Sequence, residues 1–237
     1  MSRPPPLLPP VAAVPTQLVL DFPPRAALGR EDFLVAPCNA AAVAWIDRYP
    51  QWPAHGLAVF GPPGCGKSHL AHVFASRSGA VPVSLAGLAG SNALDLAASA
   101  PAFILEEGEE VAGQDEAERH LFHFFNAVRE SGRHLLLTGR MAPARWAIKL
   151  PDLRSRLNAL PGVEIAFPDD GMMEALLVKL FADRQLRITP DALSYVLPRM
   201  ERSFAAARAL VEAADRQSLT HKRPVSVPLL REILGEG

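Results

Sequence analysis

The fold is decided by an eight-residue glycine-rich loop, which reads Gly61-Pro62-Pro63-Gly64-Cys65-Gly66-Lys67-Ser68. The loop fits the phosphate-binding pattern G-x-x-x-x-G-K-[ST] at every fixed position. A short apolar run at 57–60 precedes it and a helical pattern follows it, which is the context the motif requires. We therefore expect a nucleotide-binding α/β domain rather than a chance glycine-rich turn.

The loop contains the residue types that phosphate binding needs. Glycine lets backbone N–H groups turn inward around an anion, and the helix that begins near Lys67 presents the positive end of its dipole. We expect Lys67 to reach the β- and γ-phosphates and the Ser68 hydroxyl to bind Mg²⁺. All eight loop residues and the following His69 are the candidate nucleotide site, and the expected cofactors are ADP or ATP with Mg²⁺.

Apolar runs alternate with helical patterns on both sides of this loop. The runs that read as strands cover 57–60, 81–85, 102–105, 134–138 and 163–166. A helix is predicted over 116–130, with one apolar face made by Leu121, Phe124, Phe125 and Val128. This alternation predicts a parallel sheet flanked by helices.

The strand signal stops after Pro168, which divides the chain into three expected parts. Helices are predicted over 170–184, 190–200, 203–220 and 227–234. We expect a flexible Pro-rich tail (1–30), an α/β core (31–167) and a small helical subdomain (168–237). In the tail, the hexamer QLVLDF is either a strand that docks on the domain or a linear motif for another protein.

The composition excludes some classes of protein. Of the 237 residues, 49% are hydrophobic and 21% charged, which predicts a folded domain. The net charge is −1, whereas a free-standing DNA-binding protein usually has a basic surplus, so any contact with DNA is expected through a protein partner. No apolar run has transmembrane length and no secretory signal is evident, so we expect a cytoplasmic protein without membrane contact.

Two carboxylates, Glu106 and Glu107, follow the third predicted strand. Phosphate-loop ATPases place an acid here to hold Mg²⁺, so Glu106 is the candidate metal ligand, and both glutamates are candidate catalytic acids. An Asp is usual at the first position, and the longer Glu side chain displaces the carboxylate, which favours nucleotide binding over turnover. The alternative is a solvated acidic turn that continues into Glu109 and Glu110.

Several segments together resemble the DnaA family of AAA+ replication initiators. The His-Leu pair after Ser68 is similar to that family, and FLVAPCN, which contains Phe33 and Val35, resembles the segment that borders the adenine there. LLLTGR at 135–140 resembles the sensor 1 strand, and LPDLRSRL at 150–157 resembles the box that carries an arginine finger. The resemblance implies an AAA+ core with a helical lid.

Within the family, the chain looks most like the shorter regulators that inactivate the initiator. It ends at Gly237, directly after the helical segment, so we expect neither the helix-turn-helix domain nor the N-terminal domain of the initiators. The hexamer in the tail looks like a motif that binds the sliding clamp (β subunit) of DNA polymerase through Gln17, Leu18, Leu20 and Phe22. The resemblance therefore implies two partners, the clamp and DnaA, with DNA and the nucleoid reached only through the clamp; a homodimer is left open.

Arg156 matches the arginine finger of the family, which implies that it stimulates hydrolysis of DnaA-bound ATP in trans. The alternative for Arg156 is a surface salt bridge. At other positions the chain departs from the family. Ala205 stands where the lid's sensor 2 arginine is expected, with Arg202 or Arg208 as substitutes one turn away, and Arg140 stands at sensor 1 in place of Asp. With Glu106, these departures favour weak intrinsic hydrolysis and a nucleotide that serves as a structural ligand.

Three rival functions remain at this stage. The first is an autonomous AAA+ ATPase such as a helicase loader, against which Glu106 and Ala205 argue. The second is a DnaA paralogue that binds DNA directly, against which the charge argues. The third is a clamp-binding adaptor that has lost nucleotide binding, against which the intact phosphate loop argues.

Overall fold

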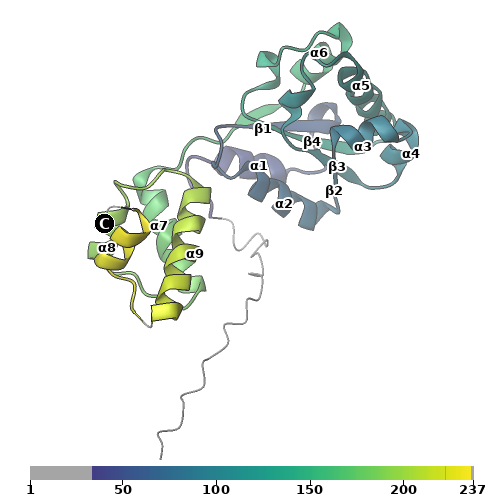
Figure 1. Cartoon of the computed structure of the whole chain (residues 1–237). Helices are drawn as coiled ribbons and strands as arrows, with labels where there is room; N and C mark the ends of the chain where they lie inside the picture. Colours follow the sequence, from purple (N-terminus) through teal and green to yellow (C-terminus); the bar gives the residue numbers. More distant parts are fainter. Residues whose placement is uncertain (1–33, 222, 236–237) are drawn as a thin grey trace, which may run out of the picture.

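The computed structural model describes residues 34–221 and 223–235 (Figure 1). Five parallel strands form one sheet in the order β2-β3-β4-β1-β5. Their bounds are β1 (Gly56–Phe60), β2 (Val81–Val83), β3 (Ala102–Leu105), β4 (His134–Gly139) and β5 (Gly162–Glu164). The order reverses between β4 and β1, and ligands of open parallel sheets bind at such a reversal, beyond the carboxyl ends of the strands. The predicted parallel sheet is thus confirmed.

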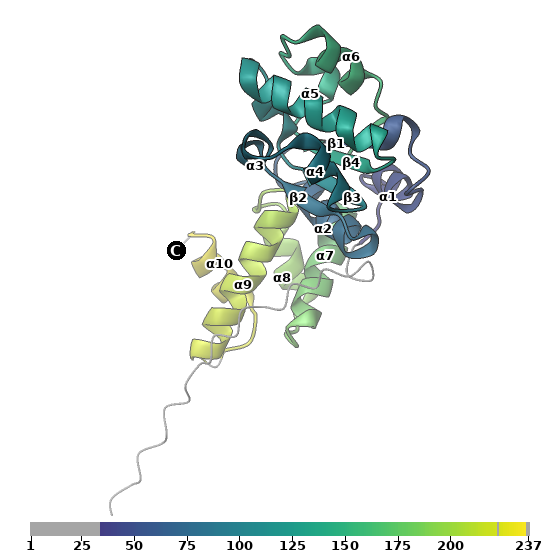
Figure 2. The same cartoon turned by 90° about the vertical axis from the view of Figure 1, so that its right-hand side faces the viewer.

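Helices cover both faces of the sheet (Figures 1 and 2). In chain order, the helices of the α/β part are α1 (Ala40–Asp47), α2 (Lys67–Ser78), α3 (Leu85–Gly90), α4 (Ala93–Ala98), α5 (Asp115–Glu130) and α6 (Pro151–Asn158). Three 3₁₀ turns join them, η2 (Pro53–His55), η3 (Gly108–Val111) and η4 (Pro143–Arg145).

The side chains of β4 show how the two faces are covered. Leu136 points into a core with α1 and α2, whereas Leu135 and Leu137 point into a second core with α5 and α6. Successive side chains of a strand face opposite sides, so a continuous leucine run suits a strand that is buried on both faces. This packing on both faces of the sheet holds β1 in place, so the phosphate loop begins from a rigid strand.

The remaining helices form a separate unit with its own core (Figure 1). They are α7 (Asp170–Asp183), α8 (Pro190–Val196), α9 (Phe204–His221) and α10 (Val227–Ile233). Leu177, Phe181 and Val211 are among the side chains buried between them. Side chains cap α7 and α8, since Met172 N donates to Asp169 Oδ1 (2.8 Å) and Ala192 N donates to Thr189 Oγ1 (3.3 Å).

The ends of three predicted elements needed correction. The strand predicted to reach residue 85 stops at Val83, because Ser84 caps α3 and its hydroxyl accepts from Gly87 N (3.1 Å). The last strand is 162–164 rather than 163–166. The helix predicted over 190–200 ends at Val196, because Pro198 has no N–H with which to continue the helical hydrogen bonds.

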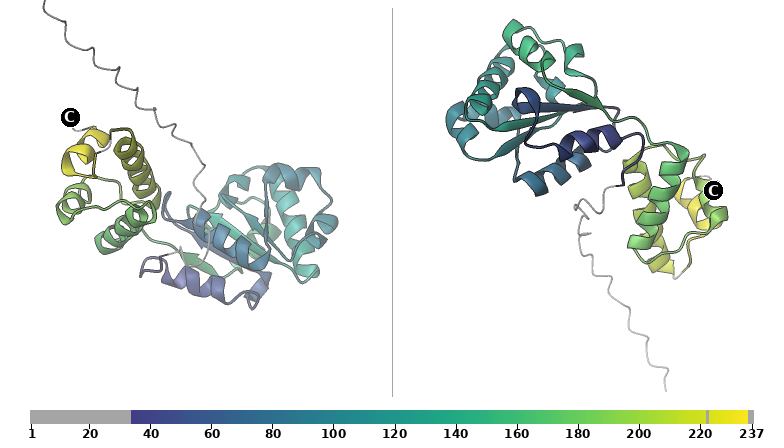
Figure 3. Two further views of the ribbon diagram at one scale, coloured as in Figure 1. Left: turned by 90° about the horizontal axis from the view of Figure 1, so that it is seen from below. Right: turned by 180° about the vertical axis from the view of Figure 1, so that it is seen from behind.

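The helical unit joins the α/β part beside the first described residues (Figure 3). Ala166 N donates to Cys38 O (3.0 Å), so the chain that enters the sheet part and the chain that leaves it run together. Within 34–221 and 223–235, no helix combines the length and apolar character that crossing a bilayer requires.

Candidate functional site

The phosphate loop joins β1 to α2 and depends on glycine at close contacts. Gly66, at the N-cap of α2, has a φ of 105°, a backbone conformation that residues with a side chain rarely adopt. Gly64 has a φ of 73°, and a Cβ atom there would lie 2.7 Å from Ser203 Cβ. The loop is therefore shaped by its glycines, and one of them is in contact with the helical unit.

Lys67 lies at the start of α2 and folds back over the loop. Its Nζ donates to the carbonyl oxygens of Gly61 (2.8 Å) and Pro62 (2.9 Å). An anion bound to the loop would compete for the same ammonium protons. The side chain is thus placed where a phosphate-binding lysine is needed.

Ser68 and Glu106 are brought together as predicted. Glu106 directly follows β3, and the Ser68 hydroxyl donates to its Oε2 atom. A hydroxyl and a carboxylate supply the oxygen ligands that Mg²⁺ prefers. The pair lines a cavity with Lys67, Glu107, Thr138 and Arg140, among others. The residues present therefore fit a nucleotide with its magnesium ion, which these side chains would hold.

Arg140, which follows β4, interacts with the acidic segment after β3. Its backbone N–H donates to Glu109 Oε1 (2.9 Å), and its Nε lies 3.8 Å from the same atom. Its Nη2 lies 3.9 Å from Glu107 Oε1. Glu107 has a left-handed backbone with a φ of 51°. Glu107 and Glu109 therefore pair with a guanidinium at the edge of the candidate nucleotide cavity.

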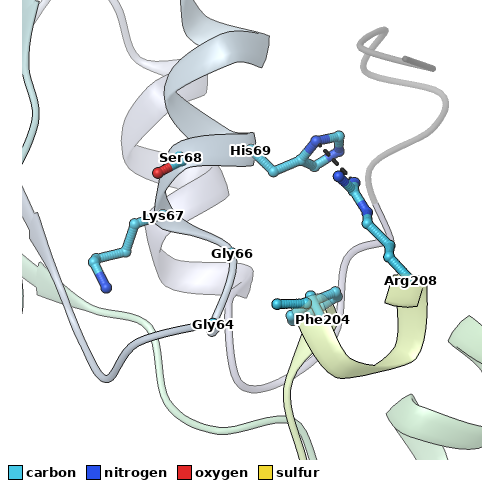
Figure 4. Close-up of a pocket in the computed structure, with 8 residues that line it drawn as sticks. Gly64, Gly66, Lys67, Ser68, His69, Phe204 and Arg208 are labelled. Carbon is cyan, nitrogen blue, oxygen red and sulfur yellow. Dashed lines mark hydrogen bonds between the residues drawn. The ribbon is translucent and has the colours of Figure 1, made fainter. Parts of the chain in front are cut away.

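Helix α9 forms the other wall of the site (Figure 4). A hollow of about 300 Å³ lies between the phosphate loop and Phe204, Ala205 and Arg208. Phe204 N donates to Gly64 O (2.9 Å), which fixes the start of α9 against the loop. The buried Ser203 caps this helix, since its hydroxyl accepts from Ala206 N (3.0 Å).

The two arginines considered as substitutes at sensor 2 have different surroundings. Arg208 lines the hollow at the phosphate loop, with its Nη2 atom 3.2 Å from His69 Nδ1 (Figure 4). Arg202 instead pairs with Asp170 at the start of α7, at 2.8 Å. Ala205 lines the hollow but has no charge to offer. Arg208 is thus the lid arginine that faces the candidate phosphate site, opposite His69.

The residues expected near the adenine are only partly described. Val35 is 56% exposed and lines a small hollow with α1 and α2 rather than the hollow at the phosphate loop. Asn39 shapes this segment, because its side chain accepts from Ala36 N and donates to Leu34 O, each at 2.9 Å. Phe33, like the tail residues Gln17, Leu18, Leu20 and Phe22, lies outside the described residues.

The two cysteines are free thiols with raised pKa values. Burial is the main cause at both, assisted at Cys38 by the charge of Asp169 and opposed at Cys65 by Lys67. A raised pKa keeps a thiol protonated and unreactive at neutral pH. Cys65 therefore acts as a small buried side chain within the loop.

Arg156 lies on α6, away from the phosphate loop. Helix α6 is at the end of the α/β part opposite the helical unit, whereas the phosphate loop contacts that unit (Figures 1 and 2). The guanidinium carbon of Arg156 lies 5.2 Å from the centre of the Phe122 ring. Within the described part of the chain, Arg156 has no salt bridge, contrary to the alternative considered from the sequence.

The sequence did not single out two residues of α5, one that contacts the segment before α6 and one that contacts Arg156. Glu118 is buried on α5, and its carboxylate accepts from the backbone N–H groups of Lys149 and Leu150, directly before α6. Burial raises the pKa of Glu118, but the hydrogen bonds outweigh it and the pKa is lowered overall. Phe122 lies one turn later on α5. The only sequence signal for Glu118 was that a charged residue occupies an apolar position of the predicted helix.

The comparisons agree with this architecture. Domain III of the Thermotoga maritima replication initiation protein DnaA has a similar fold, with a TM-score of 0.78, 16% identity and coverage of 91% of this chain and 98% of that one. AMPPCP-bound DnaA from Aquifex aeolicus has a TM-score of 0.69 at 16% identity, over 84% of this chain and 70% of that one. The FIGL-1 AAA domain in complex with ADP has a TM-score of 0.58 at 18% identity, over 76% and 70%. The chain thus has an AAA+-type fold with a C-terminal helical lid.

The sequence comparisons narrow this class. The family model described as the lid domain of Hda matches residues 169–234. An uncharacterized protein of Haemophilus influenzae is 25% identical over 185 residues, which is 74% of this chain and 80% of that protein. Residues 169–234 thus match the Hda lid domain, and the chain as a whole has the fold of the DnaA AAA+ domains.

Proposed function

We propose that this chain is a negative regulator of chromosomal replication initiation that stimulates hydrolysis of DnaA-bound ATP. The observation that carries the proposal is the Hda-type lid at 169–234 on the same chain as Arg156, whose guanidinium lies over a ring and has no carboxylate partner among the described residues. A guanidinium placed beside a γ-phosphate stabilises the charge that develops in phosphoryl transfer. Such arginines are worth about 10³–10⁵ in rate.

The position of Arg156 favours action on another protein's nucleotide. Its own phosphate loop is at the lid end of the α/β part, and α6 is at the opposite end (Figure 2). An arginine so placed does not reach the nucleotide of its own chain. Docking of the α6 end onto ATP-bound DnaA would place the Arg156 guanidinium beside that ATP.

In this proposal the chain's own nucleotide has a structural role. The loop 61–68 would hold ADP or ATP, and Ser68 and Glu106 would hold Mg²⁺. The nucleotide would tie the loop to α9, because Phe204 and Arg208 line the same hollow. These residues would thereby keep α9 on the loop when nucleotide and Mg²⁺ are bound, while Arg156 would act at the other end of the molecule.

The hexamer Gln17 to Phe22 is proposed as the anchor to the sliding clamp, with Leu18 and Leu20 as apolar contacts and the Gln17 amide as the directional one. Recruitment to clamps on DNA would raise the local concentration near DNA-bound DnaA. It would also explain a DNA-linked function in a chain with net charge −1.

The test is hydrolysis of ATP bound in advance to DnaA, with sliding clamp loaded on DNA. The full-length chain is compared with Arg156→Ala, with the neighbouring Arg154→Ala, and with the double variant Gln17→Ala/Leu18→Ala. We expect the parent chain to stimulate hydrolysis, Arg156→Ala to abolish the stimulation and Arg154→Ala to retain it. The double variant should also lose stimulation, and the reason should be that it no longer binds the clamp. Absence of stimulation by a chain that binds the clamp would refute the proposal and leave a clamp-bound nucleotide-binding protein with another target.

A further inference from the structure

We propose that helix α5 is a positioning platform for Arg156, with Glu118 fixing the backbone of α6 and Phe122 fixing the guanidinium. The inference rests on the proposed function, since it concerns how Arg156 is aimed at the nucleotide of another protein. It assigns positioning roles to two residues that are both on α5 and four positions apart. Residues four apart lie on the same face of a helix, so Glu118 and Phe122 lie on one face of α5.

Glu118 fixes the start of α6. Its carboxylate accepts from Lys149 N at 3.1 and 3.0 Å, and from Leu150 N at 2.7 Å, and Leu150 is the residue directly before α6. It also accepts from Gly113 N (2.8 Å), which lies before α5. A buried carboxylate with several backbone donors is held in one geometry, because rotation would leave a charge unpaired in the interior. The helix that carries Arg156 is therefore fixed relative to α5.

Phe122 fixes the side chain itself. The Arg156 guanidinium lies over its ring, with 5.2 Å between Cζ and the ring centre, a distance typical of a cation–π contact. The Arg156 Nε atom is buried and has no hydrogen-bond partner in the described ranges. The ring packs against the core shared by α5 and α6, so it is not free to move away. Only the outer end of the guanidinium, with its two amino groups, is left for a partner.

The combination limits the freedom of a long side chain. An unrestrained arginine loses much rotamer entropy when it is ordered at an interface, and a preorganised one loses less. No carboxylate holds Arg156 in the described part of the chain, so the order comes from the ring and does not neutralise the charge. A ring is suited to this purpose because it restrains the cation without competing for its outward hydrogen-bond donors.

The experiment measures clamp-dependent stimulation of DnaA–ATP hydrolysis by Phe122→Leu and Phe122→Tyr as functions of their concentration. Leu keeps an apolar side chain but has no aromatic face, whereas Tyr keeps the ring. We expect Phe122→Leu to lower the maximal stimulated rate by about two- to fivefold, as the loss of an exposed cation–π contact implies. The half-maximal concentration should be unchanged, and Phe122→Tyr should behave like the parent.

The same substitutions in an Arg156→Ala background show whether Phe122 acts through Arg156. We expect Phe122→Leu to have no further effect there, and thermal unfolding of both Phe122 variants to match the parent within a few degrees. If Arg156→Ala abolishes stimulation but Phe122→Leu leaves the maximal rate unchanged, or lowers it equally without Arg156, the positioning role is wrong and the proposed function stands. If Arg156→Ala itself has no effect, both are wrong.

Discussion

The backbone N–H of Leu150 donates to the buried Glu118 carboxylate at 2.7 Å, which ties the residue before α6 to helix α5. The Glu118 carboxylate joins three segments. They are its own helix α5, the residue Gly113 before α5, and the segment Lys149–Leu150 before α6. The donors are backbone groups, which otherwise have no partner at a helix start. The arrangement makes one side chain responsible for the geometry of the helix that carries Arg156.

Glu118→Gln should destabilise the fold in a pH-dependent way. The folded-state pKa of Glu118 is lowered, so its ionised form stabilises the fold above about pH 4, the usual range of glutamate, and this contribution is lost as pH falls through the folded-state pKa. At pH 7 the substitution should cost about 1.5–3 kcal/mol, the value of a hydrogen bond to a charged group. Urea unfolding followed by tryptophan fluorescence measures this free energy from pH 7 to pH 3.

Two features keep this experiment specific. Glu116→Gln, at an exposed position on the same helix, should change the unfolding free energy by less than about 0.5 kcal/mol. Burial and the neighbouring His55 also lower the pKa of His134, but the parent and the variant share that group, so their difference isolates Glu118. A difference between parent and Glu118→Gln that stays constant down to pH 3 would contradict the assignment.

Gly64→Ala should separate the lid from the phosphate loop. The substitution places a Cβ 2.7 Å from Ser203 Cβ and forces a left-handed backbone, with a φ of 73°. Gly113 is the matched control, because its φ is 80° but a Cβ there meets nothing within 4 Å. Strain alone should cost each variant about 1–2 kcal/mol.

Binding of fluorescent ADP distinguishes the two effects. Gly64→Ala should weaken nucleotide binding strongly, because Phe204 N donates to Gly64 O and the start of α9 would have to move. Gly113→Ala should leave nucleotide affinity unchanged despite a similar loss of stability. Equal affinities for the two variants would show that the contact between Gly64 and the lid has no part in nucleotide binding.

Arg208→Ala should weaken binding of ADP and ATP by about tenfold or more, since a charge-assisted hydrogen bond to phosphate would be lost. Arg202→Ala is the control on the same part of the lid. Its pair with Asp170 is exposed, with 58% and 65% of the two side chains accessible, so its loss should cost less than about 1 kcal/mol and leave nucleotide affinity unchanged. Titration of both variants with labelled nucleotide checks this, and a larger loss for Arg202→Ala would reverse the assignment.

The phosphate loop, the parallel sheet and the helical subdomain could be predicted because each has a local signal. The loop 61–68 is a contiguous motif, and the strands are apolar runs of the right length. The choice between Arg202 and Arg208 could not be made, because both are polar residues near the start of one helix and only packing of α9 on the loop decides which one faces it.

The contacts around Arg156 were beyond sequence reasoning for a related reason. Glu118 and Leu150 are 32 residues apart, and their contact depends on how α6 folds back onto α5. Phe122 lies beside Leu121 in the sequence, and the helical pattern assigned the core face to Leu121, Phe124 and Phe125. Phe122 is a half-buried ring at the edge of the apolar face of α5, and such a ring produces no distinct sequence pattern. Its role becomes visible only once the contact with Arg156 on α6 is known.

Arg140→Asn should raise the chain's own ATP turnover. Arg140 Nη2 lies 3.9 Å from Glu107 Oε1, and Nε lies 3.8 Å from Glu109 Oε1, at the cavity that Lys67 and Ser68 also line. A carboxylate that orients water must have an oxygen free to accept the water's hydrogen bond, and a neighbouring guanidinium competes for that oxygen. The pair is exposed and therefore weak, so release of the acid should increase turnover by about two- to fivefold.

Arg145→Asn, at an exposed position in η4, should leave turnover unchanged. Phosphate release at saturating ATP measures both variants. Unchanged turnover in Arg140→Asn with normal ATP affinity would show that Arg140 does not restrain hydrolysis, and Glu106 would then be the departure that limits it.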